Sequence, residues 1–335
     1  MSTSSVPVCY FPSTVIFLDE NSDFLRNFTL QPSLPFTCHF FDQTADTLEA
    51  LHLNQQSENL AQWCLNEPNQ PPITQNNFAT QTMCLDLTAI HWEVYNPQRF
   101  NECTVIVINT LASDLDKLTL CRNIQNHAIK KILLVDENEE TLVNEAIKDS
   151  LIDLCLNKQD PNIKALLLDG IKHLQMNYFL EMSDTVSKML VTKLSNCLYD
   201  PTFIDLFYQL QQQEQIVEYY LTEVSGSFLM LNAAGKPSCL VIKQQEDLLQ
   251  HYNHGKNNNL PEELLEEIKL GKKIPTFLHS NNYYQWTDWA NYIHKAQRLD
   301  GNNTYYYAYV KELWALDVHA DRILSYNDYV KQRQS

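Results

Sequence analysis

The sequence predicts an α/β domain with a doubly wound, five-stranded parallel sheet, followed by an α+β domain with a small antiparallel sheet. Between residues 14 and 158, five short apolar runs occur, and most precede a stretch with helical spacing of its apolar residues. Such alternation is typical of a parallel sheet with helices on both faces. Beyond residue 215, strand-like runs instead follow one another across turn residues. We therefore expect a first domain at 1–180, a helical connector at 181–215 and a second domain at 216–335.

The elements of the first domain can be placed from these runs. The five predicted strands are TVIFLDE (14–20), FTCHFFD (36–42), CTVIVIN (103–109), KKILLVD (130–136) and LIDLCLNK (151–158). Predicted helices cover 113–126, 138–150 and 162–180. Residues 43–102 are too many for one crossover helix and a loop, so we predict an insertion there within the first domain.

Polar side chains stand at the predicted carboxyl ends of several strands. Asp19 and Glu20 end the first, Asn109 the third and Lys158 the fifth, while Val135 ends the fourth. In a parallel sheet, ligands bind just beyond these ends. The alternative is that the acid pair favours the start of the next helix and that Lys158 is a solvated strand end.

This set of strand ends resembles the receiver domains of bacterial two-component systems, as does the segment NTLASDLDKLTLCRNI that follows the third strand. The resemblance implies a flavodoxin-like fold and a phosphorylation site at the position of Asn109. It also implies weak Mg²⁺ binding by Asp19, Glu20 and Asn109, and a phosphate pocket that includes Lys158 and Val135. A receiver uses the ion to neutralise the phosphoryl group that its carboxylate attacks.

Asn109 departs from that pattern, because an amide has no nucleophilic carboxylate and cannot form an acyl phosphate. Val135 likewise offers no hydroxyl to the phosphate. Either the domain is a natural pseudo-receiver, or Asn109 replaces an Asp in a form that cannot be phosphorylated. The sequence leaves both explanations open.

The second half predicts a mixed domain. Helices are expected around a break at Asp200-Pro201, strands at VEYYLTEV, SFLMLNA and PSCLVIK, and further helices within 244–270. A hairpin is expected about Asp300-Gly301. An enzymatic, phosphodiesterase-like site could use three charged residues on these strands, namely Glu218, Glu223 and Lys243. Solvent-facing strand positions explain them equally well, and we favour that interpretation.

Two further groups of side chains are candidate sites. His251 and His254 form an H-x-x-H pair without an evident third ligand, so we expect surface histidines. Tyr305, Tyr307 and Tyr309 share one face of a strand. Such a face can stack nucleic-acid bases, but it more often packs in a core.

The segments AIHWEVYNPQRF and DPTFIDLFYQLQQQEQIVEYYLTEVSGSFLMLNAAGKPSCLVI, together with the receiver, are similar to the LqsR-type quorum-sensing response regulators of Legionella. This implies a cytoplasmic regulator of growth phase, motility and virulence, phosphorylated by sensor histidine kinases that detect an α-hydroxyketone. It further implies a non-standard output domain. Receivers commonly pair through their last helices and strand, so a homodimer through residues 138–178 is expected.

Composition agrees with these expectations. The net charge is −17, and neither half has the basic stripe that sequence-independent phosphate binding needs. The nine cysteines form no C-x-x-C pair, as expected of reduced thiols, and no apolar run reaches the length of a membrane span. Three hypotheses remain: a switch whose output domain binds nucleic acid, nucleotide or protein; an enzymatic output domain; and a scaffold independent of phosphorylation.

Overall fold

The computed structural model describes residues 5–19, 36–53, 65–66, 84–109, 114–124, 126–136, 139–191, 197–276, 289, 292–311 and 318–334. The chain divides into two compact units. We call residues 11–59 and 98–182 the receiver unit, and residues 1–10, 60–97 and 183–335 the output unit. No helix in the described part of the chain is both long enough and apolar enough to cross a membrane.

The receiver unit contains a five-stranded sheet in which all neighbouring strands are parallel. In spatial order the strands are β3 (Thr37–Phe41), β2 (Thr14–Asp19), β6 (Cys103–Asn109), β7 (Lys130–Val135) and β8 (Leu154–Asn157). The chain runs from β2 outward to β3 and then returns to the other side of β2 as β6. This order is that of a flavodoxin-like fold. Between β2 and β6 the order in which the chain adds strands to the sheet reverses, which is the topological switch point of such a fold. The predicted fold class is thus confirmed.

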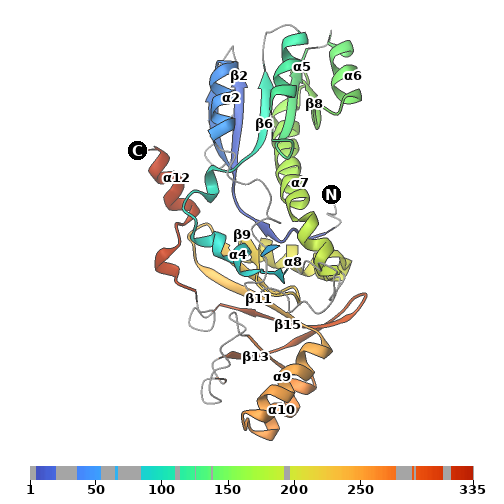
Figure 1. The fold of residues 1–335 in the computed structure, drawn as a ribbon, viewed down its shortest axis with the longest axis vertical. Helices are drawn as coiled ribbons and strands as arrows, with labels where there is room; N and C mark the ends of the chain where they lie inside the picture. Colours follow the sequence, from blue (N-terminus) through green and yellow to red (C-terminus); the bar gives the residue numbers. More distant parts are fainter. Residues whose placement is uncertain are drawn as a thin grey trace, which may run out of the picture. The chain divides into compact units, whose positions relative to one another are not determined.

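Helices cover both faces of this sheet, as Figure 1 shows for the helices beside β6. They are α2 (Thr44–Leu53), α5 (Asp114–Asn123), α6 (Glu140–Lys148) and α7 (Ile163–Val191). Because β-strand side chains alternate between faces, Ile106 packs with α5 and α6, whereas Val107 packs with α7. Gly170 lets α7 approach the sheet, since a Cβ there would lie 2.5 Å from Leu154 Cδ2.

The output unit is built on a six-stranded antiparallel sheet. Its strands, in spatial order, are β1 (Cys9–Tyr10), β9 (Ile216–Leu221), β10 (Phe228–Asn232), β11 (Pro237–Lys243), β15 (Thr304–Val310) and β14 (Gln297–Asp300). Two small ribbons pair β12 (Lys273–Pro275) with β13 (Ile293–Lys295) and β4 (Leu65–Asn66) with β5 (Cys84–Leu85). The α-helices are α4 (Thr88–Trp92), α8 (Pro201–Gln213), α9 (Gln245–Asn257), α10 (Glu262–Lys269) and α12 (Tyr326–Gln334). Short 3₁₀ turns occur at η1 (Glu93–Tyr95), η2 (Arg99–Asn101, in the receiver unit), η3 (Cys197–Tyr199) and η5 (Ala320–Arg322).

The two faces of the output sheet have different covers. On one face, the ring of Phe207 from α8 lies 4.8 Å from that of Tyr219 and 4.9 Å from that of Phe228. On the other face, α9 and α10 lie side by side and pack with Val241 of β11 (Figure 1). The face that carries Lys243 is therefore beneath helices and not open to water.

The division into units differs from the predicted limits in three places. One is the predicted connector at 181–215, of which residues 183–215 belong to the output unit. The other two are residues 1–10 and 60–97, which also group with the output unit, although we expected both segments within the first domain. β1 is an edge strand of the output sheet, where Tyr10 pairs with Tyr219. Within the predicted insertion, α4 contacts β9, and Tyr95 Oη accepts a hydrogen bond of 3.1 Å from the His319 N–H. Two-residue strands carry too little periodicity to be recognised in a sequence.

Candidate functional site

The carboxyl ends of β2 and β6 bring two predicted site residues into contact. Asp19 and Asn109 are partners in the parallel register, and both are buried. Asn109 Nδ2 donates a hydrogen bond of 2.8 Å to Asp19 Oδ1. They meet because each is the last residue of its strand, at the point where the winding of the sheet reverses. This is where ligands bind in open α/β sheets.

Lys158 comes directly after β8 and is held at the same edge by β7. Its backbone N–H donates a hydrogen bond of 2.9 Å to the Val135 carbonyl. Its ammonium forms an ion pair of 2.9 Å with Asp136 Oδ2, at the first residue after β7. Asp136 was not among the predicted site residues, because we expected it to be the last residue of the fourth strand. Its position at the sheet edge was a signal that could have identified it.

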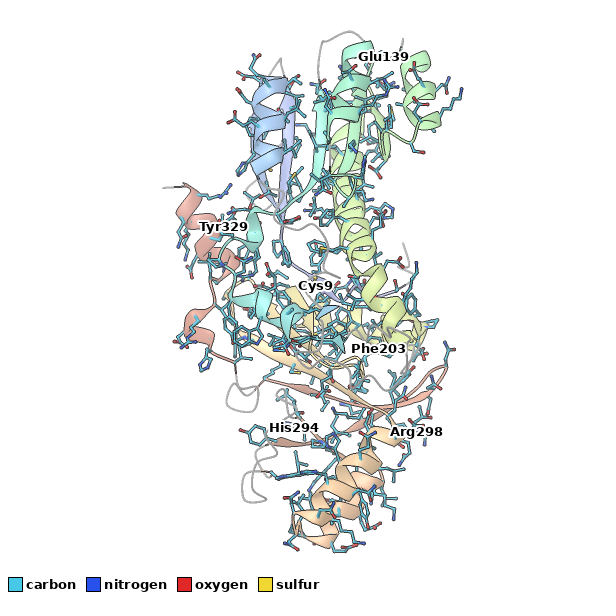
Figure 2. All side chains as sticks on the ribbon, viewed as in Figure 1. Cys9, Glu139, Phe203, His294, Arg298 and Tyr329 are labelled. Atoms are coloured by element: carbon cyan, nitrogen blue, oxygen red, sulfur yellow. The ribbon has the colours of Figure 1, made fainter. Side chains whose placement is uncertain are left out.

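Asp136 is also held through its backbone. The backbone N–H of Asp136 donates a hydrogen bond of 2.8 Å to Glu139 Oε2. Glu139, labelled in Figure 2, is the residue that precedes the first turn of α6. Val135 is buried and packs in the core with α5 and α6. The position that we predicted for the phosphate-contacting hydroxyl is therefore an apolar core position.

Of the three predicted magnesium ligands, the structure describes two, Asp19 and Asn109. Asp19 supplies one buried carboxylate, and the amide nitrogen of Asn109, as assigned, faces that carboxylate. Glu20 lies outside the described residues. Among those that are described, no three His, Cys, Asp or Glu side chains come together as a metal site. Mg²⁺ prefers oxygen ligands and keeps several waters, so Glu20 is the ligand that would have to complete the set.

In the output unit, Glu223 and Lys243 do not face solvent, and that preferred interpretation is wrong. Lys243 Nζ forms an ion pair of 2.6 Å with Glu223 Oε2, and the two side chains are 6% and 18% exposed. The hydroxyls of Ser225 and Ser227 donate to the same oxygen at 3.0 and 2.8 Å. Glu218 is also buried, and it accepts a hydrogen bond of 2.9 Å from the Tyr220 hydroxyl. The pair is buried because α9 covers the face of β11 that carries Lys243.

Burial and charge shift the pKa values around this pair. Desolvation raises the pKa of Glu223, but Lys243 and the serine hydroxyls outweigh it, so the net shift is downward. Desolvation, with a contribution from Lys243, lowers the pKa of His251 to about 3. His254 is partly buried and stacks on Trp289, with ring centroids 6.2 Å apart. The two histidines of the H-x-x-H pair are thus half-buried, not the surface residues that we expected.

The row of tyrosines on β15 divides into two roles. Tyr305 is fully buried, as a core residue would be. Tyr307 and Tyr309 are half-buried and line a cavity of about 600 Å³ between α8 and the strands β13, β14 and β15. Polar side chains on this lining include Gln209, Gln213, His294 and Gln297. The Tyr307 hydroxyl donates to Gln297 Oε1 at 2.7 Å.

Comparison with known proteins identifies the chain's relatives. No family model matches the chain, and no curated protein matches it. Among solved structures, the Legionella pneumophila response regulator LqsR is 35% identical, with a TM-score of 0.80, over 98% of this chain and 96% of that one. An adenylate cyclase from Rhodopirellula baltica is 14% identical, with a TM-score of 0.32, over 55% of this chain and 99% of that one, which is too distant to support an argument. Both the extent and the identity of the first match confirm the resemblance found in the sequence: this chain belongs to the family of the response regulator LqsR.

Proposed function

We propose that this chain is a quorum-sensing response regulator whose receiver unit controls the output unit without accepting a phosphoryl group. The observation that carries the proposal is the contact between Asp19 and Asn109 at the ends of β2 and β6, with Lys158 at the end of β8. An acid, a neutral amide and a lysine there match a phosphorylation pocket that lacks its nucleophile. This holds whether Asn109 is native or replaces an aspartate.

The chemistry of the side chains limits what such a pocket can do. A carboxylate oxygen can attack phosphorus and form an acyl phosphate, whereas an amide is neutral and a poor nucleophile. Lys158 can pair with an anionic oxygen, and Asp19 with Glu20 can hold Mg²⁺ weakly. Val135 is in the core and provides no hydroxyl to follow a phosphate inward. We therefore expect this receiver to act through assembly or partner binding.

Membership of the LqsR family suggests a cytoplasmic regulator and its partners: sensor histidine kinases and a second copy of the chain. Within residues 138–178 two large apolar side chains are exposed, Ile147 on α6 and Leu166 on α7, and each is a candidate contact to a second copy of the chain. Sedimentation at high micromolar concentration would test this, and a dimer weakened by Ile147→Glu or Leu166→Glu is the expected result. A chain that stays monomeric would contradict it.

For the output unit we propose binding and not catalysis. Glu223 and Lys243 satisfy each other's charge beneath α9, which favours a structural role over a phosphodiesterase-like site. The cavity lined by Tyr307 and Tyr309 offers aromatic faces and amide side chains, features that suit a nucleotide or another small polar ligand. Its occupant would be tested by titrating nucleotides against the chain and against Tyr307→Ala.

Phosphotransfer tests the main proposal. The chain should take no label from acetyl phosphate or a sensor kinase, whereas Asn109→Asp should gain a hydroxylamine-labile label that depends on Mg²⁺. That label should be lost again with Lys158→Ala or Asp19→Ala. Labelling of the unaltered chain at Asp114 or Asp116 would show that the strand-end assignment is displaced by several residues.

A further inference from the structure

The ammonium of Lys158 already has an anionic partner within the receiver unit. Asp136 Oδ2 lies 2.9 Å from Lys158 Nζ, and among the described residues no other carboxylate lies within ion-pair distance of it. The side chain of Lys158 is 16% exposed, so most of its surface is covered by the receiver unit. An oxyanion that approaches this lysine therefore meets the negative charge of the Asp136 carboxylate beside the ammonium.

Asp136, and not a residue at the end of β6, supplies the negative charge that pairs with Lys158. Asn109 carries no charge and donates its amide to Asp19, so it does not neutralise Lys158. Asp136 stands one residue beyond the end of β7, the strand next to β8, and its side chain is half-exposed. Its carboxylate can therefore pair with the lysine, and water can solvate it when the pair is broken.

The ion pair has a second effect, on the start of α6. The backbone N–H of Asp136 donates to Glu139 Oε2, while its side chain pairs with Lys158. Asp136 is thus tied to the residue after β8 by its carboxylate and to the start of α6 by its backbone N–H. In a phosphorylated receiver, the lysine would instead pair with the incoming phosphate.

We propose that Asp136 is a built-in counter-anion that occupies Lys158 and competes with a phosphoryl oxygen for it. The inference rests on the proposed function, since it takes the edge at Asn109 and Lys158 to be the phosphoryl pocket. Asp136 is a positioning residue: it acts through Lys158 and forms no bond to phosphorus. Two features then disfavour a phosphoryl group at this edge: position 109 lacks the nucleophile, and Lys158 already has an anionic partner.

The test uses the full-length chain carrying Asn109→Asp, with beryllofluoride and Mg²⁺ as the phosphoryl analogue. Binding is measured by ¹⁹F NMR titration with and without Asp136→Asn, which keeps the size of the side chain and removes its charge. Because a half-exposed ion pair is weak, the second substitution should tighten beryllofluoride binding by about three- to fivefold. Asp169→Asn is the matched control, since Asp169 is an exposed acid on α7 with the same change in net charge.

Two further arms separate the explanations. In the Lys158→Ala background, Asp136→Asn should leave the affinity for beryllofluoride unchanged, because no ammonium is left for the two anions to compete for. If Asn109→Asp binds beryllofluoride and Asp136→Asn leaves the affinity unchanged, or Asp169→Asn tightens it equally, the counter-anion is refuted and the receiver pocket stands. Binding that occurs only after Asp136→Asn supports the inference in its strongest form. Binding in neither variant overturns the phosphoryl pocket and the counter-anion together.

Discussion

Each unit of this protein contains a lysine–carboxylate ion pair, and the two pairs differ in what surrounds them. Lys158 and Asp136 meet at the edge of a parallel sheet, with the carboxylate half-exposed. Lys243 and Glu223 meet under α9, and two serine hydroxyls donate to the same carboxylate oxygen. The carboxylate of the first pair is in contact with water, whereas the carboxylate of the second is surrounded by its own hydrogen-bond donors. The same two functional groups thus indicate a site in one unit and a structural support in the other.

The energetic consequence of the difference is large. An exposed ion pair contributes at most about 1 kcal/mol, because water screens its charges. Removing one partner of a buried pair costs about 3–5 kcal/mol, because the other charge is left in a poorly solvating interior. Replacing each lysine and measuring the loss in the free energy of unfolding therefore tests whether the surroundings of an ion pair, and not its residue types, decide its contribution to stability.

The largest effect is expected for Lys243→Met. This substitution keeps most of the side-chain volume but leaves the Glu223 carboxylate buried without its cation. We expect the free energy of unfolding of the output unit to fall by about 3 kcal/mol, measured by scanning calorimetry. A double substitution with Glu223→Gln should recover part of the loss. A loss below about 1 kcal/mol would mean that water reaches the pair.

The second effect concerns acid. The pKa of His251 is lowered to about 3 in the folded chain, mainly by desolvation, from 6.5 in an exposed histidine. Between these values the unfolded chain binds a proton that the folded chain does not, so stability falls as the pH drops from 6.5 towards 3. At pH 5 this is at most about 2 kcal/mol. Urea unfolding at pH 7 and pH 5 should show the loss, and His251→Gln should reduce it; an equal loss in both chains would exclude His251 as the cause.

The third effect places a like charge at the receiver edge. Asn109→Asp puts a second carboxylate where the amide now donates to the buried Asp19. We expect it to destabilise the receiver unit by about 1–2 kcal/mol in EDTA, because two neighbouring carboxylates disfavour each other's charged forms. Mg²⁺ should restore the stability of this variant and stabilise the unaltered chain much less. Equal responses to Mg²⁺ would argue against a magnesium site at this edge.

The smallest effect is expected for Lys158→Met, the counterpart of Lys243→Met. Its partner Asp136 is half-exposed and can be solvated once the lysine is gone. The receiver unit should lose less than about 1 kcal/mol in the same calorimetric experiment. If the two lysine substitutions cost the same, the contrast between an open and a closed pair would be wrong.

Most strands and helices of the receiver unit could be predicted from the sequence, because buried parallel strands consist of continuous apolar runs with recognisable ends. It also predicted that Asp19 and Asn109 stand at one edge, which follows once both are placed last in their strands. It did not predict the partner of Lys158, since that depends on how the chain turns after Val135. Strand periodicity shows which residues share a face, but not that α9 would cover the face of Lys243. That assignment needs the tertiary packing.

The edge strand β1 has a practical consequence for dissecting this protein. The Leu221 N–H donates to the Val8 carbonyl at 2.7 Å, the Val6 N–H to the Leu198 carbonyl at 2.9 Å, and the Val8 N–H to Ser183 Oγ at 3.0 Å. A fragment that starts at residue 183 would lack these partners and expose the edge of β9 to other chains. During synthesis, likewise, β1 leaves the ribosome first but can complete its sheet only after β9 has followed. Deleting the first ten residues, which looks like trimming the receiver, would therefore damage the output unit.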